Sequence, residues 1–383
     1  MILKIDKKSF LLFFLLSLVF ILVNNSNELE VVSFLFKMVL SVVSVLFFLY
    51  AIISLAQLSR LNKDVLYIFI LFFLFALYTG GGAFFGSNTA MGLQRSFQLF
   101  SVLGVIYVFY SLAVKGGVEI GFRVFRYFVL FLVFVNFAIF IVVGRKYSGF
   151  LINPNLFGIW MVVLVLVCLS AEKHKGIVFY LALVFGSSLV YFSGSRTAML
   201  SFLMGLMILL LPYRFLKLPI FKKGIFFFLV LFSFFVIYFT LYFDLEVYNE
   251  AVRETSGKNL QSGRHIIWPI AMKAISLKPF WGWGSGFDLS NLIGSGLSAH
   301  NYFIQLMLQS GFIGLFLFLL IIYKVYNILF SVENKIFFKL SLSCFCGLII
   351  TQSFEVTIFQ NNLALSYPVW AIVGLTIGLK SKG

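Results

Sequence analysis

Long apolar runs recur along the whole chain and restrict its fold more than any other feature. A membrane-spanning helix needs about 20 mainly apolar residues, with a range of about 17–25. Allowing for short and tilted segments, we expect helices near residues 9–23, 31–56, 65–83, 96–114, 127–143, 156–171, 176–193, 197–212, 225–243, 301–323, 338–354 and 365–379. The sequence therefore predicts an all-α, polytopic integral membrane protein with about twelve transmembrane helices.

The composition excludes a water-soluble fold. Of the 383 residues, 62% are hydrophobic and 11% are charged, whereas a soluble domain has about 25% charged residues. We find no internal repeat and no separate soluble domain, so we expect one membrane domain over residues 1–383. Residues 244–300 form its one long loop, which contains tryptophans and an amphipathic stretch.

The net charge of +16 is distributed in short basic clusters between the apolar runs. Lys and Arg are enriched in the cytoplasmic loops of membrane proteins, which explains this pattern without nucleic acid as a partner. If the N-terminus is cytoplasmic, 19 of the 29 Lys and Arg residues fall in cytoplasmic segments and 9 outside. An even number of helices then returns the C-terminus to the cytoplasm and places the 244–300 loop outside.

Ionisable residues are nearly absent from the predicted spans, where only Lys37 lies well inside the apolar region. Transporters generally place such residues near the bilayer midplane. The polar residues collect instead at the predicted extracytoplasmic ends. This favours chemistry at the membrane surface over transport, with a flippase for lipid-linked sugars and a non-catalytic assembly subunit as the alternatives.

Two arginines at these outer ends are candidate anion ligands. Arg196 lies in a small-residue turn, residues 193–197, and a guanidinium matches phosphate oxygens. Arg264 precedes a stretch with apolar residues at 266, 270, 274 and 277, which is the spacing of one helix face. We expect a helix lying on the membrane with Arg264 at its N-terminus, a plausible anion site. Contact with lipid headgroups is the alternative for both arginines.

Aromatic and imidazole groups complete the candidates in this loop. The segment 281–286, which contains Trp283, is interpreted as a tight turn over an aromatic platform, for packing or for stacking on sugar rings. His300 and Asn301 lie where the loop enters the next helix, and histidine can act as a base near neutral pH. His265 is an alternative for that role. Arg95, in another outer loop, is a further candidate for contact with lipid phosphate.

Four segments resemble the O-antigen ligase and Wzy-type polysaccharide polymerase superfamily. They are Phe150–Asn155 with its Asn-Pro-Asn entry, Ser193–Ala198 with its Ser-Arg turn, Ser262–Gly284 with its Arg, Trp and Gly positions, and Ala299–Asn301 with the downstream Gly311 and Gly314. They occur in the expected order over roughly residues 145–320. Each segment is a weak signal alone, and the four in order are more specific.

The resemblance implies a GT-C-type glycosyltransferase of the bacterial inner membrane. Its donor would be a glycan on undecaprenyl pyrophosphate, used at the outer leaflet without a metal or a cofactor. By motif, Arg196 and Arg264 would hold the pyrophosphate, and His300 would activate or orient the acceptor hydroxyl. The substrate-binding candidates are Arg95, Asn155, His265, Trp268, Trp283 and Asn301.

Two activities within this superfamily share the same donor chemistry. A polymerase joins lipid-linked repeat units into O-antigen or capsule polysaccharide, and a ligase transfers the finished polymer to lipid A-core. We expect the polymerase, because repeat-unit polymerases are more numerous, and we keep the ligase as the alternative. A chain-length regulator and a flippase are the partners that the resemblance implies.

Overall fold

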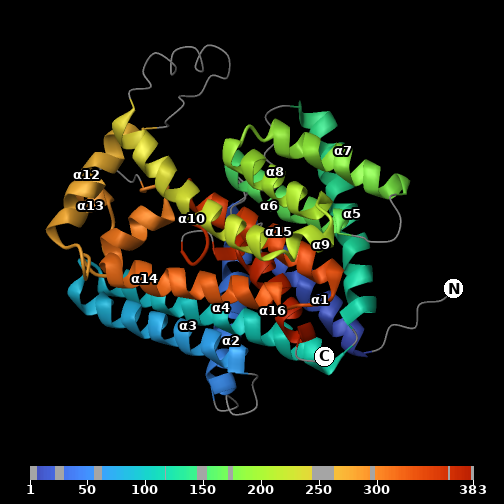
Figure 1. Cartoon of the computed structure of the whole chain (residues 1–383), viewed down its shortest axis with the longest axis horizontal. Coiled ribbons are helices and arrows are strands. Elements are labelled where there is room, and N and C mark those ends of the chain that lie inside the picture. The colour runs from blue at the N-terminus through green and yellow to red at the C-terminus, as the bar shows by residue number, and fades with distance from the viewer. Residues whose placement is uncertain are drawn as a thin grey trace.

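The computed structural model describes residues 7–21, 30–55, 63–116, 118–144, 153–170, 176–243, 263–293, 298–360 and 363–380. The regular elements in these ranges are all helices (Figure 1). They are α1 (Lys7–Ile21), α2 (Glu30–Leu55), α3 (Lys63–Gly82), η3 (Ala83–Phe85), α4 (Thr89–Lys115), α5 (Val118–Val143), α6 (Pro154–Leu169), α7 (Ile177–Phe192), α8 (Arg196–Leu210), α9 (Tyr213–Leu216), α10 (Pro219–Tyr242), α12 (Arg264–Leu277), α13 (Ser290–Ile293), α14 (Tyr302–Phe330), α15 (Lys335–Gln352), η5 (Leu363–Leu365) and α16 (Tyr367–Lys380).

Each predicted apolar segment coincides with one of these helices, so the all-α polytopic fold is confirmed. Among the described residues, seven segments are long and apolar enough to cross a membrane: Val65–Phe85, Thr89–Lys115, Val118–Val143, Pro219–Tyr242, Tyr302–Phe330, Lys335–Gln352 and Leu363–Lys380. The helices α6, α7 and α8 are apolar but have only 15 or 16 residues. At 1.5 Å per residue they measure about 24 Å, less than the roughly 30 Å of a hydrocarbon core.

Close packing at small residues holds the centre of the bundle together. The helix α4 packs against α2, α3 and α16. Gly104 of α4 lies directly against the backbone of Phe47 in α2. Small residues allow helix backbones to approach closely where lipid offers no hydrophobic driving force for association.

We expect Gly104→Ala to destabilise the bundle, because its Cβ would collide with the Phe47 carbonyl group. Overpacking of this kind typically costs about 1–3 kcal/mol. The measurement is the apparent unfolding temperature of the detergent-solubilised protein. Gly81→Ala in α3 is the matched control, since a Cβ at Gly81 meets nothing within 4 Å. Equal unfolding temperatures for the two variants would contradict this packing.

The helix predicted near Arg264 is present as α12, and it has two apolar faces. Trp268, Ala271 and Ile275 are buried against the protein, whereas Ile266 and Leu277 are exposed. The exposed residues belong to the face that the sequence pattern predicts for contact with the membrane. Figure 1 shows α12 and α13 together at one end of the molecule, beside the start of α14. Residues 244–262 and 294–297 of the long loop lie outside the described residues.

The helix α14 is interrupted where this loop reaches it. Gly311 has non-helical backbone angles, φ 60° and ψ −161°. The interruption leaves carbonyl groups of α14 without partners inside the helix, and the segment 279–284 binds two of them. The Trp283 and Gly284 amides donate to the carbonyls of Leu308 and Gln309 at 2.8 and 3.0 Å. The segment 281–286 thus turns tightly, as the sequence predicts, and is tied to α14 by main-chain hydrogen bonds.

Candidate active site

His300 lies in the short segment that leads into α14, and its backbone is held in an unusual conformation. Its φ of 46° is positive, which no other non-glycine residue in the described part of the chain shows. Such a conformation costs of order 1–3 kcal/mol and persists where neighbours hold it. Here Asn301 caps α14 by accepting from the Ile304 amide at 3.0 Å, and its own amide nitrogen donates to the Ser353 carbonyl at 2.9 Å. The flanking contacts therefore determine the position of the imidazole.

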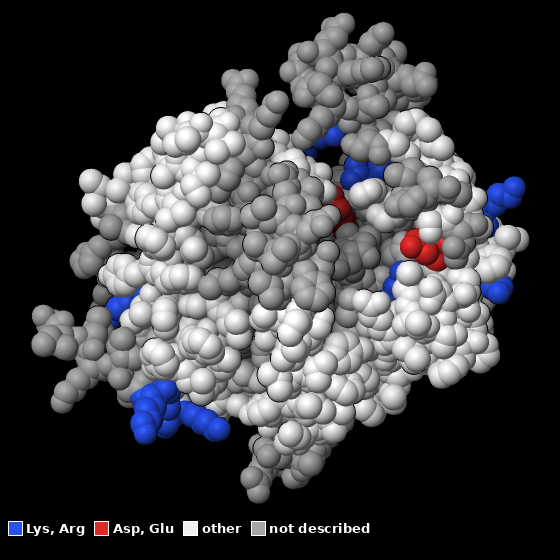
Figure 2. Space-filling model, turned by 180° about the vertical axis from the view of Figure 1, so that it is seen from behind, with Lys and Arg blue, Asp and Glu red and all other residues white. Residues whose placement is uncertain are grey.

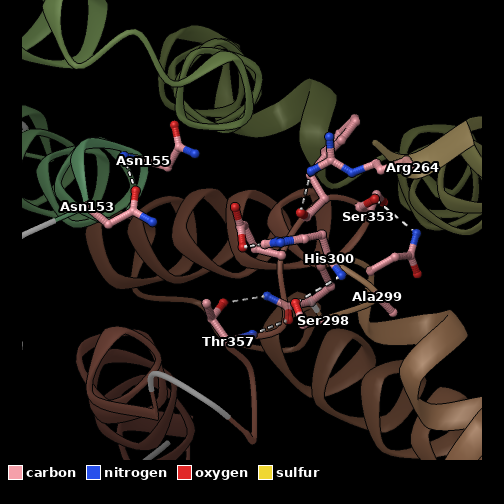
Figure 3. A network of polar contacts seen from close by, with 12 residues as sticks. Asn153, Asn155, Arg264, Ser298, Ala299, His300, Ser353 and Thr357 are labelled. Carbon is pink, nitrogen blue, oxygen red and sulfur yellow. Dashed lines mark hydrogen bonds and ion pairs between the residues drawn. The ribbon is translucent and has the colours of Figure 1, made fainter. Parts of the chain in front are cut away.

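The imidazole faces a carboxylate from a distant part of the chain. Nδ1 of His300 lies 3.4 Å from Oε2 of Glu355, and the two side chains are 40% and 14% exposed. A carboxylate beside one ring nitrogen orients the imidazole and favours a proton on that nitrogen. Nε2 is then the nitrogen that is available as a base. Figure 3 shows His300 at the centre of this polar cluster.

The segment that carries Glu355 is held by a buried glutamine. Oε1 of Gln352, the last residue of α15, accepts from the amides of Thr357 and Ile358 at 3.1 and 3.0 Å. Nε2 of Gln352 donates to the Thr357 hydroxyl at 3.0 Å. The Glu355 amide donates to the Thr351 carbonyl at 2.9 Å. The carboxylate is therefore presented from a turn with satisfied backbone groups rather than from a loose loop.

Arg264 approaches the same cluster from the start of α12. Gly263 precedes it with φ 79°, a conformation that favours glycine and turns the chain sharply into the helix. Nη2 of Arg264 donates to the Phe354 carbonyl at 3.0 Å, whereas Nε is buried and has no acceptor. Burying a donor without a partner costs about 1–3 kcal/mol. The Nε–H group of Arg264 is therefore a donor that the described residues leave unsatisfied, and its anion-binding role stays a prediction.

The electrostatic environment of Arg264 contains one negative and one positive neighbour. Desolvation by burial lowers the pKa of the guanidinium from its ordinary value, Glu355 raises it, and Arg196 lowers it further. Arginine stays charged in proteins. The positive charges of Arg264 and Arg196 and the negative charge of Glu355 therefore lie near one another. Figure 2 shows one face of the molecule on which acidic atoms are set back from the surface, with Lys or Arg atoms nearby.

Arg196 and the Asn-Pro-Asn segment come from two helix starts that pack together. Arg196 is the exposed first residue of α8, whose cap is Ser195. The cap of α6 is Asn153, whose side chain accepts from the Asn155 amide at 2.8 Å. Gly158 of α6 lies against the side chain of Ser193, which brings the two helix starts close to each other. Figure 3 shows Asn153 and Asn155 across the cluster from Arg264.

The two tryptophans among the candidates both have structural contacts. Trp268 is fully buried, and its indole N–H donates to the Ala299 carbonyl at 2.8 Å, one residue before His300. The Trp283 indole donates to the Ala274 carbonyl at 2.9 Å, and the Lys278 ammonium lies 4.2 Å from its ring centroid. Trp268 thus supports the His300 segment. Stacking of a sugar on Trp283 stays a prediction.

Arg95 and His265 differ in their surroundings. Arg95, in α4, is 7% exposed and donates to the Ser285 and Phe287 carbonyls, the latter at 3.1 Å. These bonds tie the turn after Trp283 to the bundle, and contact of Arg95 with lipid phosphate stays a prediction. His265 follows Arg264 on α12 and is exposed. Its role in substrate binding is likewise a prediction.

Comparison with known proteins bears on this cluster. A family model described as O-antigen ligase matches residues 181–319. That range includes Arg196, Arg264 and His300. Residues 181–319 are therefore similar to the O-antigen ligase family. The expectation from the four sequence segments is thereby confirmed.

Three curated proteins are similar to this chain over part of their length. Two are proteins named "Putative polysaccharide ligase": one from Rickettsia conorii, 27% identical over 237 residues, and one from Rickettsia felis, 27% identical over 240 residues. Each match covers 58% of this chain, and 55% and 56% of the respective relative. A "ComP-specific O-oligosaccharyltransferase" from Acinetobacter baylyi is 26% identical over 257 residues, which cover 55% of this chain and 45% of that protein. The chain spans about half the length of the curated relatives it matches.

Glu355 is the member of the cluster that sequence reasoning missed. It lies beyond the range of the O-antigen ligase family model and in none of the four resembling segments. One signal was available: it is the single acidic residue in 334–383, directly after an apolar run. A lone acidic residue at a membrane helix is a functional candidate by default.

Proposed function

We propose that the chain is a ligase-type membrane glycosyltransferase, which moves a glycan from a polyprenyl-pyrophosphate donor to an acceptor hydroxyl. The observation that carries the proposal is the contact between His300 and Glu355 beside the buried, unpartnered Nε of Arg264. This arrangement combines a base with an anion site. The names of the relatives favour the ligase over the polymerase that we expected from the sequence, for which we find no specific support.

The proposed reaction is a displacement at the anomeric carbon of the donor sugar. Nε2 of His300 takes the proton of the acceptor hydroxyl as its oxygen attacks that carbon. The bond between the carbon and the pyrophosphate oxygen breaks, and the electron pair leaves with the pyrophosphate. Arg264 and Arg196 stabilise the charge that develops on this leaving group, which is the role of preorganised donors in a partly desolvated site. The products are the glycosylated acceptor and polyprenyl pyrophosphate.

In this mechanism the leaving group is already activated, so no nucleotide, metal or other cofactor is needed. The attacking and leaving oxygens lie on opposite faces of the sugar, and the anomeric configuration inverts. We place the site at the extracytoplasmic end of the inner-membrane protein, where the long 244–300 loop is predicted to lie. The charge bias of the loops supports this orientation.

A gene deletion complemented with the wild type tests the function. The surface polysaccharide is separated by size on a gel, and lipid-linked glycan is extracted from the membranes. For a ligase we expect the deletion to leave the acceptor without sugar while lipid-linked polymer accumulates. An acceptor capped by a single repeat unit would indicate the polymerase instead. A deletion without any glycan phenotype would contradict both activities.

Glu355→Gln tests the orienting role of the carboxylate. The variant keeps the shape of the side chain and removes its charge, so we expect transfer to fall about ten- to a hundredfold, as when a partner of a functional histidine is lost. The rate is measured on membranes with matched expression and saturating donor. The matched control is Glu333→Gln, an exposed glutamate between α14 and α15. A Glu355 variant that matches this control would remove Glu355 from the site.

A further inference from the structure

A second polar site lies at the end of α14 far from His300. A cavity of about 250 Å³ opens between α3, α14 and α16. Its polar lining consists of Tyr67, Tyr323, Lys324, Asn327, Ser331 and Lys380. Among the described residues that line the cavity, the charged ones are the two lysines.

The two lysines are partly withdrawn from solvent. Lys324 and Lys380 are both half-buried, and the Lys324 ammonium lies 5.4 Å from the centroid of the Tyr67 ring. Lys380 is the last residue of α16, where the helix dipole favours positive charge. A concave, half-desolvated site with two ammonium groups and nearby hydroxyls favours an anion, and lysine is a common phosphate ligand.

The position of the cavity corresponds to the opposite membrane surface. Tyr67 lies near the start of the candidate span Val65–Phe85, and the far end of α3 meets the long loop, where the Ser285 amide donates to the Gly82 carbonyl at 3.2 Å. This span has 21 residues, which is roughly 31 Å along a helix. The hydrocarbon core of a bilayer is about 30 Å thick. If His300 is at the outer interface, the cavity is therefore at the level of the inner headgroups.

A lipid-facing surface leads from the cavity along α3. Tyr67, Ile70, Leu74 and Leu77 are all exposed and recur at the spacing of one helix face. The helix α3 runs beside α14, as Figure 1 shows, and the Tyr78 hydroxyl donates to the Ser310 carbonyl at 2.9 Å. Acyl chains attached to a headgroup in the cavity would lie along this apolar face. A soluble phosphate compound would make no use of it.

We propose that this cavity binds the phosphate headgroup of an anionic phospholipid from the cytoplasmic leaflet. Lys324 and Lys380 contact the phosphate, the Tyr67 and Tyr323 hydroxyls contact the rest of the headgroup, and one acyl chain lies on Ile70 and Leu74. The site is separate from the His300 cluster and does not depend on the glycosyltransferase activity.

Native mass spectrometry of the purified full chain with phosphatidylglycerol tests the proposal. We expect the wild type to retain one lipid that phosphatidylcholine does not replace. A lysine near a membrane surface contributes about a fivefold gain in binding of anionic lipid, so the double variant Lys324→Gln, Lys380→Gln should retain about 25-fold less. Lys223→Gln is the matched control, since Lys223 is exposed on α10 near the same end and outside the cavity.

Two further measurements complete the test. The first asks whether binding is lost through the missing charge or through misfolding, and the second asks whether the ligand is a lipid or a soluble phosphate. Lys324→Arg, Lys380→Arg keeps both charges, and we expect it to retain the lipid. Glycerol 1-phosphate carries the phosphate without acyl chains, and we expect no retained adduct. Equal phosphatidylglycerol retention by the Gln variant and the Lys223→Gln control would overturn the site. Retention of glycerol 1-phosphate as strong as that of the lipid would overturn the assignment to a phospholipid.

Discussion

Replacing His300 by Ala is expected to lower glycan transfer by about 10²–10⁴-fold, the usual contribution of a positioned general base. The reason is geometric: Nδ1 faces Glu355 at 3.4 Å, which leaves Nε2 to receive the proton of the acceptor hydroxyl. The measurement is the initial rate of transfer from lipid-linked donor to acceptor in membranes with matched expression. The loss should be in the rate at saturating substrate, because the acceptor can still bind.

His265→Ala is the comparison for this prediction, because His265 is the alternative base and a candidate for substrate binding. His265 is exposed on α12 and directly follows Arg264, so it lies near the cluster without the contact to Glu355. We expect it to lose less of the rate at saturating substrate than His300→Ala, because a loss of substrate binding alone raises the KM. If His265→Ala were the more damaged variant, the base would have to be reassigned. Unchanged transfer by His300→Ala would exclude His300 from the chemistry.

Most of the fold could be predicted because the bilayer imposes a length on each apolar run. The runs at 96–114 and 301–323 were recognisable from length and hydropathy alone, and both are helices. The interruption of α14 at Gly311 was not predictable in the same way. It depends on hydrogen bonds from the 279–284 segment to α14, which is a tertiary contact with no local signature.

The candidate site could be predicted only where its residues sit in local motifs. Arg196, Arg264 and His300 each stand at a helix start with a small-residue turn or a cap beside them. Glu355 is 55 residues from His300 in the chain, and no spacing rule links the two. The buried Nε of Arg264 depends on the packing of α12 against the 353–355 segment, which a sequence pattern does not encode.

Replacing Arg264 by Ala is expected to reduce transfer by about 10²–10³-fold, the typical effect of removing one preorganised donor from a developing oxyanion. Its buried Nε lacks an acceptor in the described structure, and in the proposed reaction the guanidinium binds a pyrophosphate oxygen. Arg264→Lys should recover only part of the rate, because an ammonium keeps the charge and loses the planar fork. Lys273→Ala, an exposed basic residue on the same helix, is the matched control and should behave like the wild type.

Arg264 also donates to the Phe354 carbonyl, so its substitution has a structural effect that has to be separated from the chemical one. A hydrogen bond from a charged group contributes about 1.5–3 kcal/mol, which the unfolding temperature of the solubilised variant will report. A double-mutant cycle with Arg196→Ala isolates the shared role. If both guanidinium groups hold one pyrophosphate, the combined loss should differ from the product of the single losses, as it does for residues that act on one group. Losses that multiply independently would instead place Arg196 and Arg264 on different parts of the substrate.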